Sequence, residues 1–133
     1  MATIRSYTTI EQSRKLAKIL PLESADMLFQ LGEDKYADSI RVPLTKKHWE
    51  QITPDINPCW SLAALLGVLP NNEHIDTTIS RGSWKIDTIE YLPDTWWCEY
   101  EDTKNQTEFN ISADNPVDAC VAMIEKLHGL NLL

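Results

Sequence analysis

The sequence predicts an α+β protein, in which an antiparallel sheet of four to six strands carries three to four helices packed on it. Apolar residues recur with the 3.6-residue period of helices near both ends of the chain, and with a period of two between residues 75 and 112. The chain has 133 residues, of which 43% are hydrophobic and 24% are charged, and these values are typical of one globular domain. We therefore expect a single domain over residues 1–133.

The first helix is expected from Thr8 to about Leu20, directly before Pro21. Thr8 and Glu11 have the spacing of a capping box, in which each side chain pairs with a free backbone N–H of the first turn. The apolar stripe of this helix consists of Ile10, Leu16, Ala17 and Leu20. After a short turn, residues 27–31 and 36–42 have the composition of two strands, and the turn-forming residues 32–35 between them predict a hairpin.

Residues 43–70 are expected to be helical. Thr45 can cap a short helix that runs through Trp49, and Pro54 and Pro58 interrupt the helical pattern after it. A second helix is capped by Ser61 or Asn57 and ends at Pro70. It is apolar on most sides, so we expect it to be buried.

The strands of the second half are expected at residues 75–79, 84–92, 96–101 and 107–112. Residues 81–83, 93–94 and 102–105 contain glycine, proline or short polar side chains and are expected to connect them. Alternation in the third of these strands places Trp96, Cys98 and Tyr100 on one face and Trp97, Glu99 and Glu101 on the other. In the last strand, Phe109 and Ile111 are expected to face inward.

The last helix has the most complete set of local signals. Asn115 is its expected N-cap, Pro116 its first residue, and Asp118 lies in the electropositive first turn. Its expected buried face consists of Val117, Cys120, Val121, Ile124 and Leu127. Gly129 is expected to end the helix in the left-handed conformation, with Leu130 folded back onto the last turn.

Charge is distributed unevenly along the chain. Residues 71–133 contain 4 basic and 12 acidic residues and so carry the whole net charge of −8. An acidic surface repels phosphate backbones, so direct binding of nucleic acid is disfavoured. The apolar run at residues 62–69 is too short to span a bilayer, the start of the chain does not have the pattern of a signal peptide, and the odd number of cysteines does not suggest a disulfide framework. A cytoplasmic location without membrane association is expected.

Few residues have the spacing of a catalytic or metal site. Cys59 lies next to an expected helix start and is the one cysteine placed for an activated thiol, whereas Cys98 and Cys120 fall on apolar faces. The histidines, His48, His74 and His128, are far apart and form no metal-binding motif. We therefore expect no metal and no cofactor. Glu99, Glu101 and Asp102 could form an acid–base cluster, but alternation puts only the two glutamates on the polar strand face.

The adjacent tryptophans indicate an interaction surface. Trp96 and Trp97 point to opposite faces of one strand, so a single core cannot contain both rings. Either a second structural layer covers the Trp97 face, or the ring of Trp97 is exposed or lies in an interface. Aromatic side chains are enriched in protein interfaces. We therefore select Trp97, Glu99 and Glu101 as the candidate interaction residues.

Four segments, TTIEQSRKL (residues 8–16), PLESADM (21–27), WSLAALL (60–66) and DNPVDACVAMIEKL (114–127), resemble a group of short proteins. These uncharacterised proteins occur in gut anaerobic bacteria, in phage, prophage and other mobile-element neighbourhoods, and have no assigned activity. The resemblance implies that genetic setting and supplies no catalytic residues.

Two functions remain as hypotheses. The first is a non-catalytic accessory or protein-interaction protein of a phage or mobile element, which binds a protein partner or a second copy of itself. The alternative is a small, hydrolase-like enzyme that uses Cys59 or the strand carboxylates with a histidine. We favour the first, because no combination of nucleophile, base and oxyanion donors is visible in the sequence.

Overall fold

The computed structural model describes residues 5–30, 40–43, 56–85 and 90–133. Its helices are α1 (Ile10–Leu16), the 3-10 helix η1 (Leu22–Ser24), α3 (Leu62–Val68) and α4 (Pro116–Gly129). Its strands are β1 (Met27–Gln30), β2 (Ile40–Pro43), β3 (Ile56–Cys59), β4 (Ile75–Lys85), β5 (Glu90–Asp102) and β6 (Thr107–Ala113). The α+β class predicted from the sequence is confirmed.

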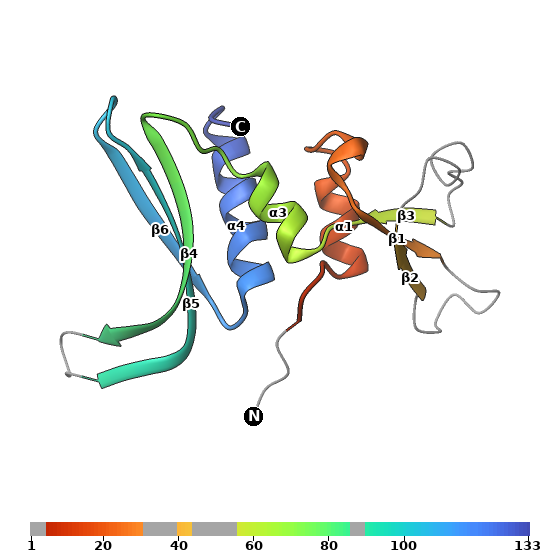
Figure 1. Ribbon diagram of the computed structural model, residues 1–133, viewed down its shortest axis with the longest axis horizontal. Helices are drawn as coiled ribbons and strands as arrows, with labels where there is room; N and C mark the ends of the chain where they lie inside the picture. The colour runs from red at the N-terminus through yellow and green to blue at the C-terminus, as the bar shows by residue number, and fades with distance from the viewer. Residues whose placement is uncertain (1–4, 31–39, 44–55, 86–89) are drawn as a thin grey trace.

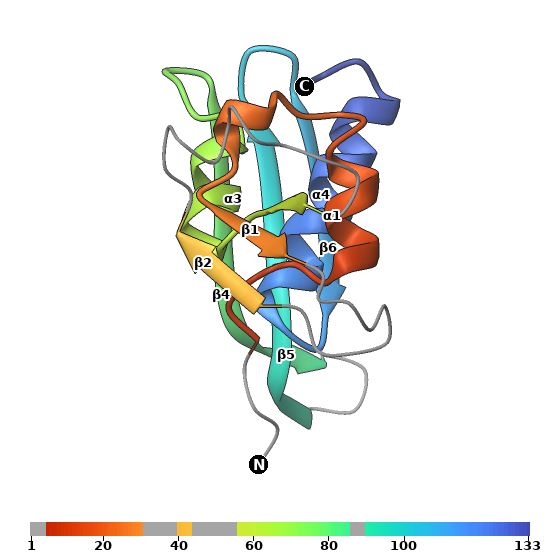
Figure 2. The same cartoon turned by 90° about the vertical axis from the view of Figure 1, so that its right-hand side faces the viewer.

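The strands form two antiparallel three-stranded sheets, with the helices between them. The N-terminal sheet has the order β2-β1-β3, and the C-terminal sheet has the order β4-β5-β6. Figure 1 shows α4 against the C-terminal sheet, α3 in the middle of the molecule, and α1 beside the N-terminal sheet. The view from the side places the N-terminal sheet in front of the helices and the C-terminal sheet behind them (Figure 2).

The core lies between the C-terminal sheet and the helices. Its largest fully buried side chains include Trp60, Tyr100, Leu65 and Met123. Tyr100 also stacks on Phe109, with ring centroids 4.8 Å apart, and the ammonium group of Lys126 on α4 lies 4.5 Å from the centroid of the Phe109 ring. In the described part of the chain, no helix has both the length and the apolar character that crossing a bilayer requires.

The first helix begins one residue later than predicted. Its capping box joins Thr9 and Gln12: Thr9 Oγ1 accepts from Gln12 N at 3.1 Å, and Gln12 Oε1 accepts from Thr9 N at 3.0 Å. Thr8 is fully buried instead, and its Oγ1 accepts from the N–H of Trp60 at 3.1 Å. The helix ends at Leu16, short of the predicted end, and the chain continues in tight turns to Leu20.

The predicted hairpin is confirmed in its described part, where β1 pairs with β2 from Met27↔Pro43 to Gln30↔Ile40. The predicted turn at residues 32–35 and the predicted short helix from Thr45 to Trp49 lie outside the described residues. The prediction of helix across residues 43–70 was wrong for β3, which pairs with the other side of β1. Pro58 and Asn57 are unusual in strands, but β3 is an edge strand, where a missing N–H is tolerated.

Ser61 is the N-cap of α3, as one of the two predicted alternatives had it, and its Oγ accepts from Ala64 N at 3.1 Å. The prediction that this helix is buried is confirmed for part of its surface. Leu65 and Leu69 are buried, whereas Ala63 and Gly67 are exposed. The helix packs on α4 and η1, and its remaining apolar side chains, Leu62, Ala64, Leu66 and Val68, are partly buried against the core.

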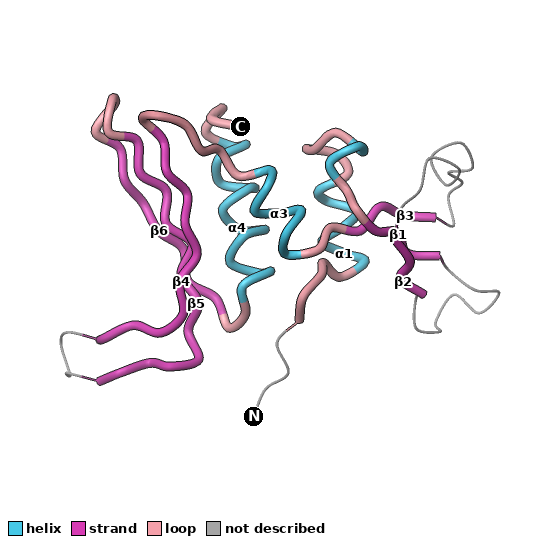
Figure 3. The backbone as a smooth tube through the Cα atoms, in the orientation of Figure 1, coloured by secondary structure: helices cyan, strands magenta, loops and turns pink. Residues whose placement is uncertain are grey.

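The boundaries of β4 and β5 differ from the prediction. Residues 81–83 are not a turn; they form a bulge inside β4, where Gly82 has a φ of +83°. Pro93 and Asp94 are not a connection but lie within β5. Because β6 pairs with β5 only as far as Trp96↔Ala113, the ends of β4 and β5 continue as a two-stranded arm (Figure 3).

Helix α4 confirms most of its prediction. Asn115 Oδ1 accepts from Asp118 N at 2.9 Å, Pro116 occupies the first turn, and all five predicted face residues are buried. The predicted ending was wrong, because Asn131, with a φ of +57°, adopts the left-handed conformation in place of Gly129. The N–H of Leu132 reaches the carbonyl of Leu127 at 2.8 Å and that of Asn131 reaches His128 at 3.1 Å, the pattern of a Schellman motif. Leu130 is exposed and does not fold back.

Candidate interaction surface

The C-terminal sheet has one face covered by helices and one face on which no described helix or strand lies (Figure 1). We call the second the outer face. It is formed by Asp76, Thr78 and Ser80 of β4, Trp97, Glu99 and Glu101 of β5, and Glu108, Asn110 and Ser112 of β6. The structure thus places the three candidate interaction residues together on one sheet face.

Strand pairing aligns acidic side chains across this face. Asp76 is directly opposite Glu101, and Glu101 is directly opposite Glu108, so three strands contribute one row of carboxylates. Glu99 belongs to the next outward-facing row, between Thr78 and Asn110. Like charges directly opposite each other on a sheet are destabilising. The row therefore reduces the stability of the isolated sheet.

No cation among the described residues compensates these charges. The positions of the outer face include no lysine, arginine or histidine, and none of its carboxylates takes part in an ion pair between described residues. The guanidinium carbon of Arg81 on β4 lies 5.7 Å from the ring centroid of Trp96, and the guanidinium pairs with Asp94 at 3.5 Å. Its charge is therefore used on the other side of the sheet.

Trp97 is the one aromatic side chain among the outer-face positions. It lies between Ser80 on β4 and Ser112 on β6, and it is partly exposed. Its indole Nε1 is buried by the surrounding atoms and has no hydrogen-bond partner among the described residues. Burying a hydrogen-bond donor without a partner lowers the stability of the folded protein. Hydrogen bonding within the sheet therefore does not explain why the Trp97 ring lies here.

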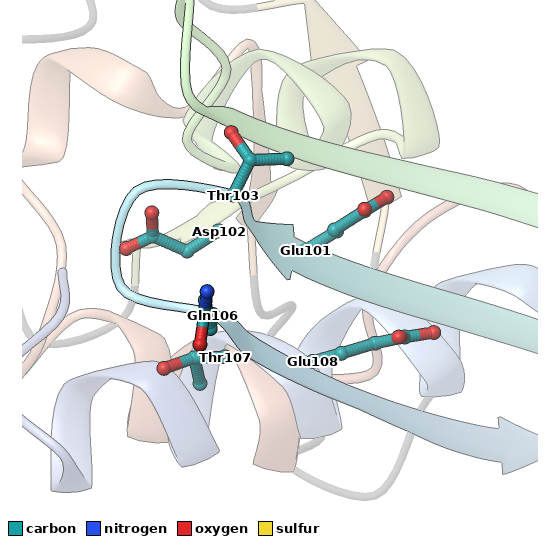
Figure 4. Close-up of a pocket in the computed structure, with 6 residues that line it drawn as sticks. All are labelled: Glu101, Asp102, Thr103, Gln106, Thr107 and Glu108. Carbon is teal, nitrogen blue, oxygen red and sulfur yellow. The ribbon is translucent and has the colours of Figure 1, made fainter.

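A hollow of about 300 Å³ lies at the turn that joins β5 to β6. It is lined by Glu101, Asp102, Thr103, Gln106, Thr107 and Glu108. Figure 4 shows Glu101 and Glu108 extending in the same direction from neighbouring strands. Ligand pockets are mostly apolar with a few converging polar groups, whereas this hollow is acidic and hydroxylic.

Asp102 stabilises that turn and is not available as an acid–base group. Its side chain accepts from Asn105 Nδ2 at 2.8 Å, Lys104 N at 3.0 Å and Asn105 N at 3.2 Å, and only 4% of its surface is exposed. The hydrogen bond from the Asn105 side chain lowers the pKa of this carboxyl below its usual value, and the two backbone donors and the charge of His74 act in the same direction against the opposing effect of burial.

The cysteines are all buried and none is in a disulfide. Cys59 is the last residue of β3 and precedes the α3 N-cap, Ser61, by two residues. It has no exposed surface, and its Sγ lies 3.6 Å from Thr8 Oγ1. Cys120 on α4 interacts with Cys98 on β5, and this interaction together with burial raises the pKa of the Cys120 thiol. Within the described ranges, no three His, Cys, Asp or Glu side chains are grouped to hold a metal ion, and His48 lies outside those ranges.

Sequence reasoning identified Trp97, Glu99 and Glu101 but missed Asp76 and Glu108. Both missed residues alternate with inward-facing neighbours in their own strands, which is a usable signal for their face. Their alignment with Glu101 depends on the register between strands, which alternation within one strand does not give.

Comparison with protein-family models, with curated proteins and with solved structures gives no match for this chain. The surface must therefore be interpreted from its own chemistry.

Proposed function

We propose that this protein is a non-catalytic accessory protein of a phage or other mobile element, acting in the cytoplasm by binding another protein through its outer face. One observation carries the proposal: a sheet face without a covering element among the described residues combines an aromatic ring with a row of unpaired carboxylates. Charges of one sign directly opposite each other on a sheet are destabilising, so the row has a cost that the sheet itself does not explain. The mobile-element setting rests on the four sequence segments described above.

The acidic charge of the outer face favours a protein partner over a nucleic acid, because phosphates would be repelled. Electrostatic complementarity speeds association and selects among partners, whereas a buried aromatic ring supplies much of the binding energy. Trp97 and the adjacent glutamates combine these two contributions. A second copy of the chain is the simplest partner to test, because two-fold dimers are the commonest oligomers.

A small enzyme receives less support from the same observations. A cysteine nucleophile must be reached by its substrate, and Cys59 has no exposed surface. Of the strand carboxylates, Asp102 is already held by donors of its own turn, and Glu99 and Glu101 lie on an open face.

The proposal is tested by affinity capture with a matched control. A tagged wild-type protein is compared in its host with Trp97→Ala/Glu99→Lys/Glu101→Lys and with Leu22→Ala/Glu23→Lys/Glu125→Lys. Both triple variants truncate one accessible apolar side chain and reverse two exposed acids, and only the first alters the outer face. Circular dichroism establishes that both are folded.

We expect at least one protein, or a second copy of the chain, to be retained by the wild type and the control and lost from the outer-face variant. Light scattering at several concentrations detects the second-copy case. If every captured protein is retained equally by both variants, the outer face is not the binding surface. A hydrolytic activity that survives both variants would instead support the enzyme hypothesis.

A further inference from the structure

We infer that the partner docks a segment with lysine or arginine at alternate positions, in extended conformation, along β5 on the outer face. This inference rests on the proposed function and names the chemistry of its partner. The occupant is a basic protein segment rather than a second copy of this chain or a nucleic acid.

The first reason is the unpaired charge. Asp76, Glu101 and Glu108 stand in one cross-strand row, where directly opposed side chains have Cβ atoms about 4.5–5.5 Å apart. Cations placed between these carboxylates would remove their mutual repulsion as well as adding attraction. No ion pair between described residues involves these carboxylates, so cations of a partner can pair with them.

The second reason is the spacing along β5. Trp97, Glu99 and Glu101 are two residues apart, and outward-facing residues of a strand repeat about every 6.6 Å. An extended peptide has the same repeat. Basic side chains at its alternate positions can therefore reach Glu99 and Glu101 together, while a third lies on the ring of Trp97. Long cationic side chains pack well on an indole through their apolar stems and through cation–π attraction.

The third reason concerns the other possible occupants. A second copy seated on the outer face would bring a like acidic surface against this one, and repulsion between carboxylates that lose their water is not screened as exposed charges are. A nucleic acid would bring phosphates to the same carboxylates. A basic segment is the occupant whose charge is complementary.

The test uses a fluorescein-labelled peptide of twelve residues in which lysine and threonine alternate, titrated against the full chain at about 150 mM salt and followed by anisotropy. The outer-face variant is Glu99→Gln/Glu101→Gln/Glu108→Gln. The control is Glu11→Gln/Glu23→Gln/Glu125→Gln, whose residues are also exposed acids and lie outside the C-terminal sheet. Both variants lose the same charge, so a difference between them reports the place of binding rather than overall charge.

We expect the outer-face variant to raise the dissociation constant at least tenfold and the control to change it less than twofold. Trp97→Ala is expected to raise the dissociation constant severalfold without changing the dependence of the affinity on salt concentration. Absence of binding by the wild type, or equal weakening in both glutamine variants, would overturn the basic-segment inference.

These outcomes are distinct from failure of the proposed function. If affinity capture finds a partner that depends on the outer face while the peptide result is negative, the face is an interaction surface for another kind of segment. Light scattering that shows a dimer which the outer-face variant dissociates would likewise retain the function and replace the basic segment by a second copy.

Discussion

The ring of Tyr91 on β5 lies directly over Gly82 on β4, at the bulge where β4 bends. A Cβ added to Gly82 would come within 2.9 Å of the ring carbon Cζ and would contact the phenolic oxygen more closely still. The φ of Gly82 is +83°, which side chains of L-residues rarely adopt. Glycine is therefore required at position 82 for two reasons: the backbone has a positive φ, and the ring of Tyr91 leaves no room for a Cβ.

Gly82→Ala is expected to lower the free energy of unfolding by about 1–3 kcal/mol, the usual cost of a residue held in an unfavourable backbone region. Gly67→Ala is the control, because a Cβ there meets nothing within 4 Å and the residue lies in a helix. That change is expected to stabilise the protein by about 0.5–1 kcal/mol. Urea titration compares the two. Equal midpoints would show that the bulge is not held as described.

The buried face of α4 provides a second prediction. Ile124 has no exposed surface and belongs to the core cluster, so Ile124→Ala is expected to cost about 2–5 kcal/mol. Glu125→Ala, one residue on and exposed, is expected to change stability by less than about 0.5 kcal/mol. Urea midpoints measure both, and an unchanged midpoint for Ile124→Ala would mean that the helix is rotated.

Substitutions of the adjacent residues Thr8 and Thr9 are expected to lower the stability of the protein for different reasons. Thr8→Val keeps the shape of the side chain but leaves the buried N–H of Trp60 without its acceptor, which costs about 1–3 kcal/mol. Thr9→Ala removes the N-cap of α1, at about 0.5–2 kcal/mol. Restoring a cap with Thr9→Ser is expected to recover stability at position 9, and Thr8→Ser to retain it at position 8. Thermal unfolding measures all four, and a neutral Thr8→Val would contradict the Trp60 contact.

Asp102 makes stability depend on acid pH. The folded state lowers the pKa of this carboxyl, so the unfolded chain binds the proton more readily. The stabilisation is therefore complete above the unfolded pKa, near 3.9, and is lost as the pH falls through the lower folded value. Asp102→Asn is expected to be less stable than the wild type at pH 7, with the difference shrinking below about pH 4. Asn105→Ala, which removes the strongest donor, is expected to reduce the same pH dependence. Urea midpoints from pH 3 to 7 check this, and a constant difference would contradict it.

The thiols should be protected by folding. All three cysteines are buried, so N-ethylmaleimide is expected to leave the native protein unlabelled for minutes at pH 7 and to add three labels in concentrated urea. Intact mass measures the labels. Rapid single labelling of native protein at Cys59 would contradict its burial and support the enzyme hypothesis.

Local signals predicted some elements well and others poorly. The residues of α4 include a cap, a first-turn proline and a complete apolar face, and these act within the helix itself. Strand β3 was missed because Asn57 and Pro58 favour turns, and only the edge position of the strand makes them tolerable. Gly82 was interpreted as part of a turn because glycine at a positive φ occurs both in turns and in bulges.

The candidate surface could be predicted from the sequence only as far as the pattern within one strand allows. Alternation identified Trp97, Glu99 and Glu101 as neighbours, since it depends on one strand alone. The carboxylate row exists only after β4 and β6 pair with β5 in a particular register, which is fixed by the inward side chains and the turns.

The arrangement of the two sheets along the chain has a consequence for how the protein folds. β4, β5, β6 and α4 are consecutive in sequence, and each packs on its immediate neighbour. The other half is closed by distant pairs, such as Thr8 N with Trp60 O and Leu62 N with Ser6 O. Closing a long loop lowers the entropy of the chain before stabilising contacts can form. The meander and its helix are therefore expected to order first, and the N-terminal segment to dock onto an already folded surface.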